Sequence, residues 1–428
     1  MKIENRKLSG GVSLGIINTD KFKNNYFALN FLLPISAENI AEGNVLARVL
    51  FNGTKKHPSV SSLSKHIGML YDPTVEISST KYASAVVFRV SAFYLADEYL
   101  PKNETLRVFS EVTSLLTELL TEPITKNGAL SEAFTEREKK HQVDRIRAQI
   151  NNKDSYALNR CATLMLGDIP AALDALGTEE TVSAITARSL YEKLHFILNK
   201  CPVEAVFAGK FTEDAESTAL SFLSSLLGGR DEGAIIPYPK AVKPTFSGEV
   251  MDVTEDISAN QGRMIMGFSM PESKDGFGRI EVFNDIFGGS PVSRLFANVR
   301  ERLNLCYYCS STQNYTLNVM YVRSGISPEN LTLAREEIMR QLELLKDPEN
   351  ISEEELSAAR LGIVSAYNSV CDSPSKYASW YITRRILGRD TDIEKAITEV
   401  KNVDARAVAE VAQSVRPVIN YFLNGTEV

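Results

Sequence analysis

Residues 26–51, YFALNFLLPISAENIAEGNVLARVLF, have the pattern of an apolar strand followed by a helix, and the same order returns at residues 263–287. Further matches follow in the same order along both halves of the chain. They pair residues 115–120 and Pro123 with 341–345 and Pro348, 154–157 with 375–378, 186–188 with 404–406, and 205–209 with 421–425. The later offsets drift only from 225 to 216 residues (348 − 123 = 225; 421 − 205 = 216). Five matches in one order indicate an internal duplication.

The duplication predicts two homologous domains of about 200 residues each, which is a normal domain size. We expect an N-terminal domain at residues 1–227, a linker at 228–247 and a C-terminal domain at 248–428. The linker contains the run GGRDEG, which begins at Gly228, followed by several prolines. Such a composition breaks helices and keeps a chain extended.

Composition favours a globular protein of the cytoplasm. The chain is 44% hydrophobic and 24% charged with a net charge of −7, and no apolar stretch approaches the ~18 residues that a membrane span needs. No apolar run follows the charged N-terminus, so neither a secretory signal nor a membrane partner is expected. The five scattered cysteines suit free thiols in a reducing compartment. The mild acidity argues against nucleic acid as a partner.

Each half has an α+β pattern. Strands are predicted at residues 85–90 and 318–322, and apolar positions at three- and four-residue steps predict helices at 105–120 and 331–345. A further helix is expected at residues 131–150. Its buried side is predicted to consist of Phe134, Val143 and Ile146. We therefore expect antiparallel-rich sheets, each with helices packed on one face.

Residues 42–54, EGNVLARVLFNGT, contain the first chemically informative motif. The segment resembles the pitrilysin/insulinase-type zinc peptidases (inverzincins), in which His-x-x-Glu-His lies on a helix that ends in Met/Leu-x-Phe-x-Gly-Thr. In that motif the two His bind zinc and the Glu is the general base. Alignment on the shared Phe-x-Gly-Thr end places Asn44 and Arg48 at the two His positions and Ala47 at the Glu position.

These replacements cannot perform the chemistry of the motif. An amide is a poor zinc ligand, a guanidinium is a permanent cation, and alanine has no base. The resemblance implies a third ligand on a later helix, and the alignment there places Arg145 at that position with Asp144 beside it. We therefore expect this chain to bind no metal. The two arginines suggest a replacement for the charge of the lost ion.

Other candidate ligands are weaker. The four histidines have no partner four residues away and are expected to be ordinary surface or half-buried residues: His57, His66, His141 and His195. Cys306 and Cys309 form a C-x-x-C pattern in a strand-like segment. Residues three apart on a strand point to opposite faces, so we expect two unrelated strand cysteines.

Residues 287–307, FGGSPVSRLFANVRERLNLCY, resemble the C-terminal domain of the same peptidases. There, Gly-Gly-Ser-Pro opens a helix, an Arg ends it and a Tyr lies seven residues on. Arg300 and Tyr307 fill these positions. The resemblance implies two domains that face each other as a clam-shell, with the Arg and Tyr reaching across to orient the peptide and stabilise the oxyanion. In the structural alternative, Arg300 forms a local salt bridge and Tyr307 packs in the sheet.

The zinc motif is lost and the helper residues are retained, so the resemblance implies one half of a split enzyme. It is similar to the YfmF/YmfF-like partner subunits of bacteria and to the non-catalytic subunit of mitochondrial processing peptidase. We predict a heterodimer with a zinc-bearing homologue that cleaves short extended peptides, bound by strand addition. Zinc is expected only in the partner. The alternatives are a stand-alone or homodimeric peptide-binding, chaperone-like module and a purely structural subunit.

Overall fold

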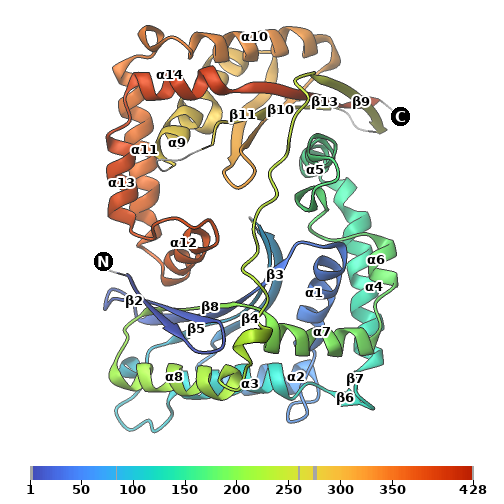
Figure 1. Cartoon of the computed structure of the whole chain (residues 1–428), viewed down its shortest axis with the longest axis vertical. Helices are drawn as coiled ribbons and strands as arrows, with labels where there is room; N and C mark the ends of the chain where they lie inside the picture. Colours follow the sequence, from blue (N-terminus) through green and yellow to red (C-terminus); the bar gives the residue numbers. More distant parts are fainter. Residues whose placement is uncertain (1–2, 83, 259–260, 273–276, 427–428) are drawn as a thin grey trace. The chain divides into compact units, whose positions relative to one another are not determined.

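The computed structural model describes residues 3–82, 84–258, 261–272 and 277–426, and the chain divides into two compact units (Figure 1). Unit 1 comprises residues 1–147, 173–241 and 370–391, and unit 2 comprises residues 148–172, 242–369 and 392–428. Each unit contains one large sheet with helices packed on it, so the α+β prediction is confirmed. Within the described ranges, no helix combines the length and apolarity needed to cross a bilayer.

The sheet of unit 1 has six strands in the order β1-β2-β8-β3-β5-β4. Neighbouring strands are antiparallel except β2 and β8, which run parallel. The bounds are β1 Ile3–Leu8, β2 Val12–Asn18, β3 Asn24–Pro34, β4 Thr74–Tyr82, β5 Ala85–Leu95 and β8 Val203–Gly209, with a separate pair β6 Thr125–Lys126 and β7 Ala129–Leu130. β4 is an edge strand.

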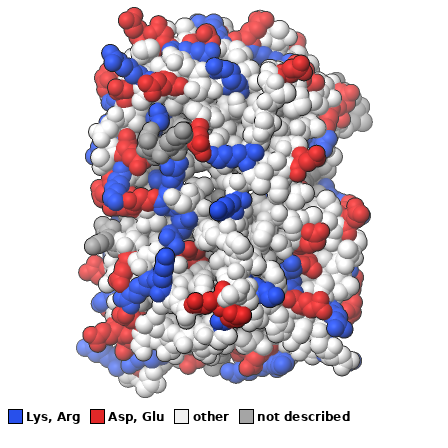
Figure 2. Space-filling view, in the orientation of Figure 1, with Lys and Arg blue, Asp and Glu red and all other residues white. Residues whose placement is uncertain are grey.

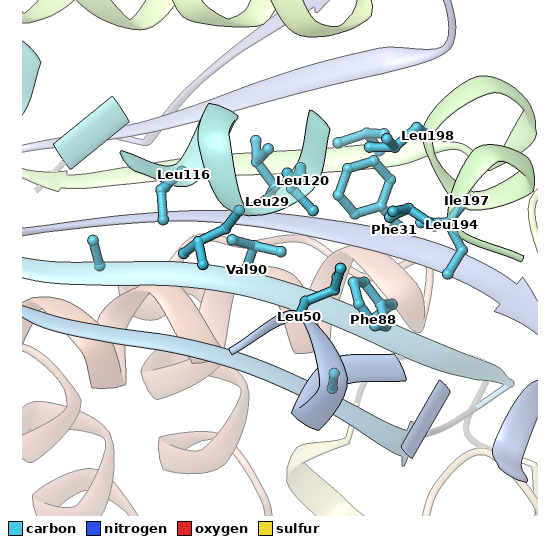
Figure 3. Packing of buried hydrophobic residues seen from close by; sticks show 14 of the residues in the cluster. Leu29, Phe31, Leu50, Phe88, Val90, Leu116, Leu120, Leu194, Ile197 and Leu198 are labelled. Carbon is cyan, nitrogen blue, oxygen red and sulfur yellow. The ribbon is translucent and has the colours of Figure 1, made fainter. Parts of the chain in front are cut away.

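The core of unit 1 lies between this sheet and the helices on one of its faces. The helices of unit 1 are α1 Ala37–Leu50, α2 Val60–Met69, α3 Val108–Thr121, α4 Glu132–Ala148, α6 Glu179–Ser183, α7 Ala187–Lys200, α8 Glu213–Leu227 and α12 Pro374–Ile386, of which α12 packs on the other face of the sheet. Alternate residues of β3 and β5 point into this core because a strand has a period of two. Figure 3 shows buried side chains from both strands with those of α1, α3 and α7: Leu29, Phe31, Leu50, Phe88, Val90, Leu116, Leu120, Leu194, Ile197 and Leu198.

The sheet of unit 2 has five strands in the order β11-β12-β10-β13-β9, and only β13 and β9 are parallel. Its strands are β9 Met251–Ser258, β10 Gly262–Ser269, β11 Cys306–Asn314, β12 Val319–Ile326 and β13 Arg416–Thr426. Its α-helices are α5 Lys153–Leu166, α9 Gly278–Asn284, α10 Leu331–Leu344, α11 Glu353–Val370, α13 Ile393–Lys401 and α14 Ala405–Ser414, and two π-helices cover Asp285–Gly289 and Phe296–Arg302.

The two sheets share one topology, which confirms the duplication. The order β4-β5-β3-β8-β2 in unit 1 corresponds to β11-β12-β10-β13-β9 in unit 2, with the parallel pair at the same place. The matched helix starts also agree. Thr186 caps α7 by accepting a hydrogen bond from Ser189 N, and Asp404 caps α14 by accepting one from Ala407 N.

Two segments with matched helices lie in the unit formed mainly by the other half of the chain. Residues 148–172, with helix α5, belong to unit 2, and residues 370–391, with helix α12, belong to unit 1. α5 packs on β10 and β13 of unit 2, and α12 packs on β8, β3 and β2 of unit 1. Glycines leave room for both helices. A Cβ on Gly15 would lie 2.4 Å from the Tyr381 ring, and one on Gly267 would lie 2.6 Å from Met165 Sδ.

Helix α4 is confirmed, but its inner face is more polar than predicted. Phe134, Val143 and Ile146 are only half-buried against the core. The buried residues of α4 are Thr135, Glu138 and Gln142. Two of these have polar partners, since Gln142 donates to Leu176 O (2.8 Å) and Glu138 accepts from Asn52 (2.9 Å).

Candidate functional site

Helix α1 carries Asn44, Ala47 and Arg48, three of the four residues predicted to stand at the altered zinc positions, and its packing on β4 creates a cavity. The helix starts after Ser36, whose side chain accepts a hydrogen bond from Asn39 N. Gly43 allows close approach to β4, because a Cβ there would lie 2.4 Å from Ser79 Oγ. The cavity has a volume of about 480 Å³. Its walls are formed by Asn44, Ala47, Arg48, Phe51, Arg145 and residues 75–80 of β4.

All four residues at the altered zinc positions therefore line one cavity, and Asp144 does not line it. Asn44 is buried, and its amide donates to Ile40 O (2.9 Å) and to Ala175 O (3.1 Å). Its donor groups are thus occupied by the backbone. Ala47 adds only a methyl group to the wall. Neither residue offers a base or a charged ligand.

Arg48 and Arg145 bring two positive charges to the cavity. Both side chains are half-buried. Arg145 Nη1 donates to Gln142 Oε1 at 2.9 Å. Burial, together with the nearby charge of Arg48, lowers the pKa of Arg145. Within the described residues, neither guanidinium forms an ion pair.

These cavity residues do not suit zinc, because guanidinium groups repel a cation. In the described part of the chain, no group of three or more His, Cys, Asp and Glu side chains could hold a metal ion. Sequence reasoning missed one pairing of histidines. The rings of His57 and His66 stack with centroids 4.4 Å apart. His57 lies before α2 and His66 within it, a relation that helical spacing does not reveal.

Arg300 and Tyr307 lie in unit 2. Arg300 belongs to the π-helix Phe296–Arg302, where its guanidinium covers the Phe296 ring at 4.6 Å and its Nη1 lies 2.9 Å from Glu301 Oε1. The local salt bridge of the structural alternative is therefore present. Tyr307 does not pack in the sheet, because it is 73% exposed. Its hydroxyl is accessible from solvent.

The prediction that Cys306 and Cys309 point to opposite faces is wrong. The β11 register shifts just after Cys306, where Tyr307 is the extra residue of a β-bulge. Cys306 therefore lies opposite Ile326 and Cys309 opposite Ser324, two positions apart on one strand, and both thiols are buried. The pKa of Cys306 is lowered to about 7, first by a hydrogen bond from the Cys309 thiol and further by Ser324 and the charge of Arg300, against the opposing effect of burial. The bulge shifts the in–out alternation by one residue, but the paired tyrosines and serines around it, at Tyr307–Tyr308 and Ser310–Ser311, do not reveal the shift in the sequence.

Figure 2 shows Lys and Arg side chains together with Asp and Glu side chains over the visible face. Both signs of charge are therefore present on this surface, in agreement with the small net charge of −7 for the chain.

Comparisons with known proteins agree with these features. Residues 200–363 match the family model described as the Peptidase M16 inactive domain. The chain is 26% identical to the "Probable inactive metalloprotease YmfF" of Bacillus subtilis (strain 168), over 98% of this chain and 97% of that protein.

Two solved structures share the fold. A conserved protein from Enterococcus faecalis V583 has a TM-score of 0.88 at 23% identity, with 99% of both chains covered. A peptidase M16 inactive domain from Pseudomonas fluorescens has a TM-score of 0.77 at 13% identity, covering 100% of this chain and 99% of the other. The chain is therefore similar in sequence to an inactive homologue of the M16, or pitrilysin/insulinase-type, peptidases, and it shares their fold.

Proposed function

We propose that this chain is the non-catalytic subunit of a heterodimeric zinc peptidase whose other subunit is a zinc-bearing homologue. The pair cleaves short extended peptides. This chain binds no zinc, and the zinc of the partner supplies the activated water. The chain contributes Arg300 and Tyr307 to the recognition of the peptide and of its transition state.

The observation that carries the proposal is the contrast between the two sets of residues. The altered zinc positions contain a backbone-bonded amide, a methyl group and two guanidinium groups, whereas Tyr307 presents an exposed hydroxyl. In a chain without metal ligands, donors that stabilise the transition state can contribute to catalysis only if another subunit supplies the metal.

The chemistry of Arg300 and Tyr307 suits a carbonyl oxygen that gains negative charge. A guanidinium offers forked N–H donors and a phenol offers one O–H donor. Donors aimed at this oxygen lower the barrier, because they interact more strongly with the oxyanion than with the neutral carbonyl. The ion pair of Arg300 with Glu301 is half-exposed and easily exchanged for a ligand.

Affinity purification of the chain from its native cell, followed by mass spectrometry, tests the pairing. We expect a homologue bearing His-x-x-Glu-His at a ratio near one to one. Recovery of the chain alone would support the peptide-holding or the structural alternative instead. We propose that the pair acts in the cytoplasm, in keeping with the five free cysteines.

Substitutions in the reconstituted pair test the roles of the two residues. Tyr307→Phe should lower kcat/KM about 10²-fold without changing stability, because the loss of one oxyanion donor has an effect of this size. Arg300→Gln should act in the same direction. Tyr99→Phe is the matched control, since Tyr99 is also exposed (42%) and lies in unit 1. Unchanged peptide cleavage by both variants would remove the assigned roles.

A further inference from the structure

The cavity between α1 and β4 combines features that cost stability unless a ligand compensates them. Arg48 and Arg145 both line it, both are half-buried, and neither forms an ion pair within the described residues. Two guanidinium groups that share one cavity repel each other, and partial burial weakens their screening by water. An anion placed between them would relieve the repulsion.

We propose that this cavity binds a carboxylate group of an extended peptide through Arg48 and Arg145. The inference rests on the proposed function for the kind of ligand, a peptide. It goes beyond that function by assigning the altered zinc positions a role of their own. The site that binds a cation in a zinc peptidase binds an anion in this chain.

The guanidinium groups, the volume and the edge strand of the cavity between α1 and β4 all favour a carboxylate carried by a peptide. A carboxylate is planar, and a guanidinium can donate two parallel hydrogen bonds to it. The cavity volume of about 480 Å³ falls within the range of ~300–1,000 Å³ typical of ligand sites. One wall is the edge strand β4, which pairs with β5 on its other side. An extended peptide can add to such an edge through backbone hydrogen bonds.

A second, smaller cavity lies next along β4. Its volume is about 200 Å³, and it shares Ser78 and Thr80 with the first. Ile382 and Ile386 of α12 contribute apolar walls to it. A peptide along β4 would therefore place a carboxylate in the first cavity and an apolar side chain in the second.

Glu76 of β4 also lines the first cavity, but it is exposed and forms no ion pair with either arginine in the described structure. Two guanidinium groups and one carboxylate leave a positive balance among the lining residues. The cavity thus retains a net attraction for an anion.

The test measures fluorescence anisotropy of the whole chain, without any partner, with labelled peptides of alternating valine and threonine. One peptide ends in a free carboxylate, one ends in an amide, and a third ends in an amide but contains an internal glutamate. We expect the peptide with the free C-terminal carboxylate, or the amidated peptide with the internal glutamate, to bind at least about tenfold more tightly than the amidated peptide without a carboxylate. Tighter binding of the former would identify the peptide terminus as the source of the carboxylate, and tighter binding of the latter would identify an acidic side chain.

Variants connect this preference to the cavity. Arg48→Gln and Arg145→Gln should each remove most of the preference for the carboxylate and leave the affinity for the neutral peptide unchanged. Arg188→Gln is the charge-matched control, because Arg188 is 77% exposed and pairs with Glu192 on the surface of unit 1. Thermal unfolding of each variant shows whether it is folded.

Three results would overturn the proposal. The first is a carboxylate preference that persists in both cavity variants, and the second is the absence of any such preference in the parent chain. The third is binding of inorganic phosphate, abolished by Arg48→Gln, to a chain that does not prefer the carboxylate peptides over the neutral one. Because no partner is present, these results are independent of the pairing. A chain that binds the peptides but never co-purifies with a zinc-bearing homologue would keep the carboxylate site and lose the proposed function.

Discussion

Replacement of Arg385 tests whether a buried ion pair fixes α12 on the sheet of unit 1. Glu204 lies on β8 with its side chain only 3% exposed. Arg385 of α12 donates to both of its carboxylate oxygens, with Nε to Oε2 at 3.1 Å and Nη2 to Oε1 at 2.8 Å. Burial raises the pKa of Glu204, and the hydrogen bonds and charge of Arg385 act in the opposite direction.

The magnitude follows from the burial of Glu204. Arg385→Met keeps apolar volume but leaves the carboxylate without its partner, which costs about 3–5 kcal/mol in the free energy of unfolding. Replacement of both residues by methionine should recover most of this loss, because two apolar side chains carry no desolvation penalty. In the single variant the pKa of Glu204 rises further above its value in the unfolded chain. The variant should therefore lose most stability at high pH, where folding must keep the carboxylate charged.

Trp380 provides the assay. It is the only tryptophan of the chain and lies on α12, where its indole donates to Thr391 O at 3.0 Å and Arg384 covers its ring at 4.3 Å. Its fluorescence during urea unfolding reports on the docking of this helix. The wild type, both single variants and the double variant form a cycle that isolates the pair. A coupling energy below about 0.5 kcal/mol would refute the reasoning, because such a value is typical of exposed pairs.

Three other experiments examine the contact of α1 with β4, the pKa of His66 and the reactivity of the thiols. Gly43→Ala should cost about 1–3 kcal/mol in urea unfolding, because the new Cβ meets Ser79 Oγ at 2.4 Å, and Ser79→Gly in the same chain should recover part of it. Burial, followed by the charge of a second histidine, lowers the pKa of His66, so the folded chain should lose stability as pH falls below about 6.5. His66→Gln should flatten this loss between pH 7.5 and 5.5, and an unchanged slope would contradict the assignment. Iodoacetamide labelling followed by mass spectrometry should modify Cys306, with a pKa of about 7, before Cys161, whose pKa burial raises to about 12.

Much of the fold could be predicted because local patterns carry it. The strand at residues 85–90 lies within β5, and the helix expected at 331–345 is α10 at Leu331–Leu344. Residue chemistry also sufficed to see that Asn44 and Arg48 cannot hold zinc. The meeting of Arg145 with these residues could be expected only from the family resemblance, since 97 positions separate Arg145 from Arg48 (145 − 48 = 97).

Other features could not be predicted because no local pattern reports them. The bulge at Tyr307 brings Cys306 and Cys309 to one face by shifting the strand alternation by one residue, and the similar residues on either side of the bulge do not reveal that shift in the sequence. The stacking of His57 on His66 likewise depends on the path of the chain into α2. The buried polar face of α4 depends on distant backbone groups, such as the carbonyl of Leu176, that accept its hydrogen bonds.

The amino-acid sequence alone indicated the duplication and several of the strands and helices, since these are properties of residue types and their spacing, and the family resemblance predicted the loss of the zinc chemistry. Only the tertiary structure decided which sheet each matched helix covers. An apolar helix face requires burial, but it does not specify the surface against which it is buried. That choice depends on complementary positions far away in the chain, such as Gly15 facing Tyr381 and Glu204 pairing with Arg385 across 181 residues.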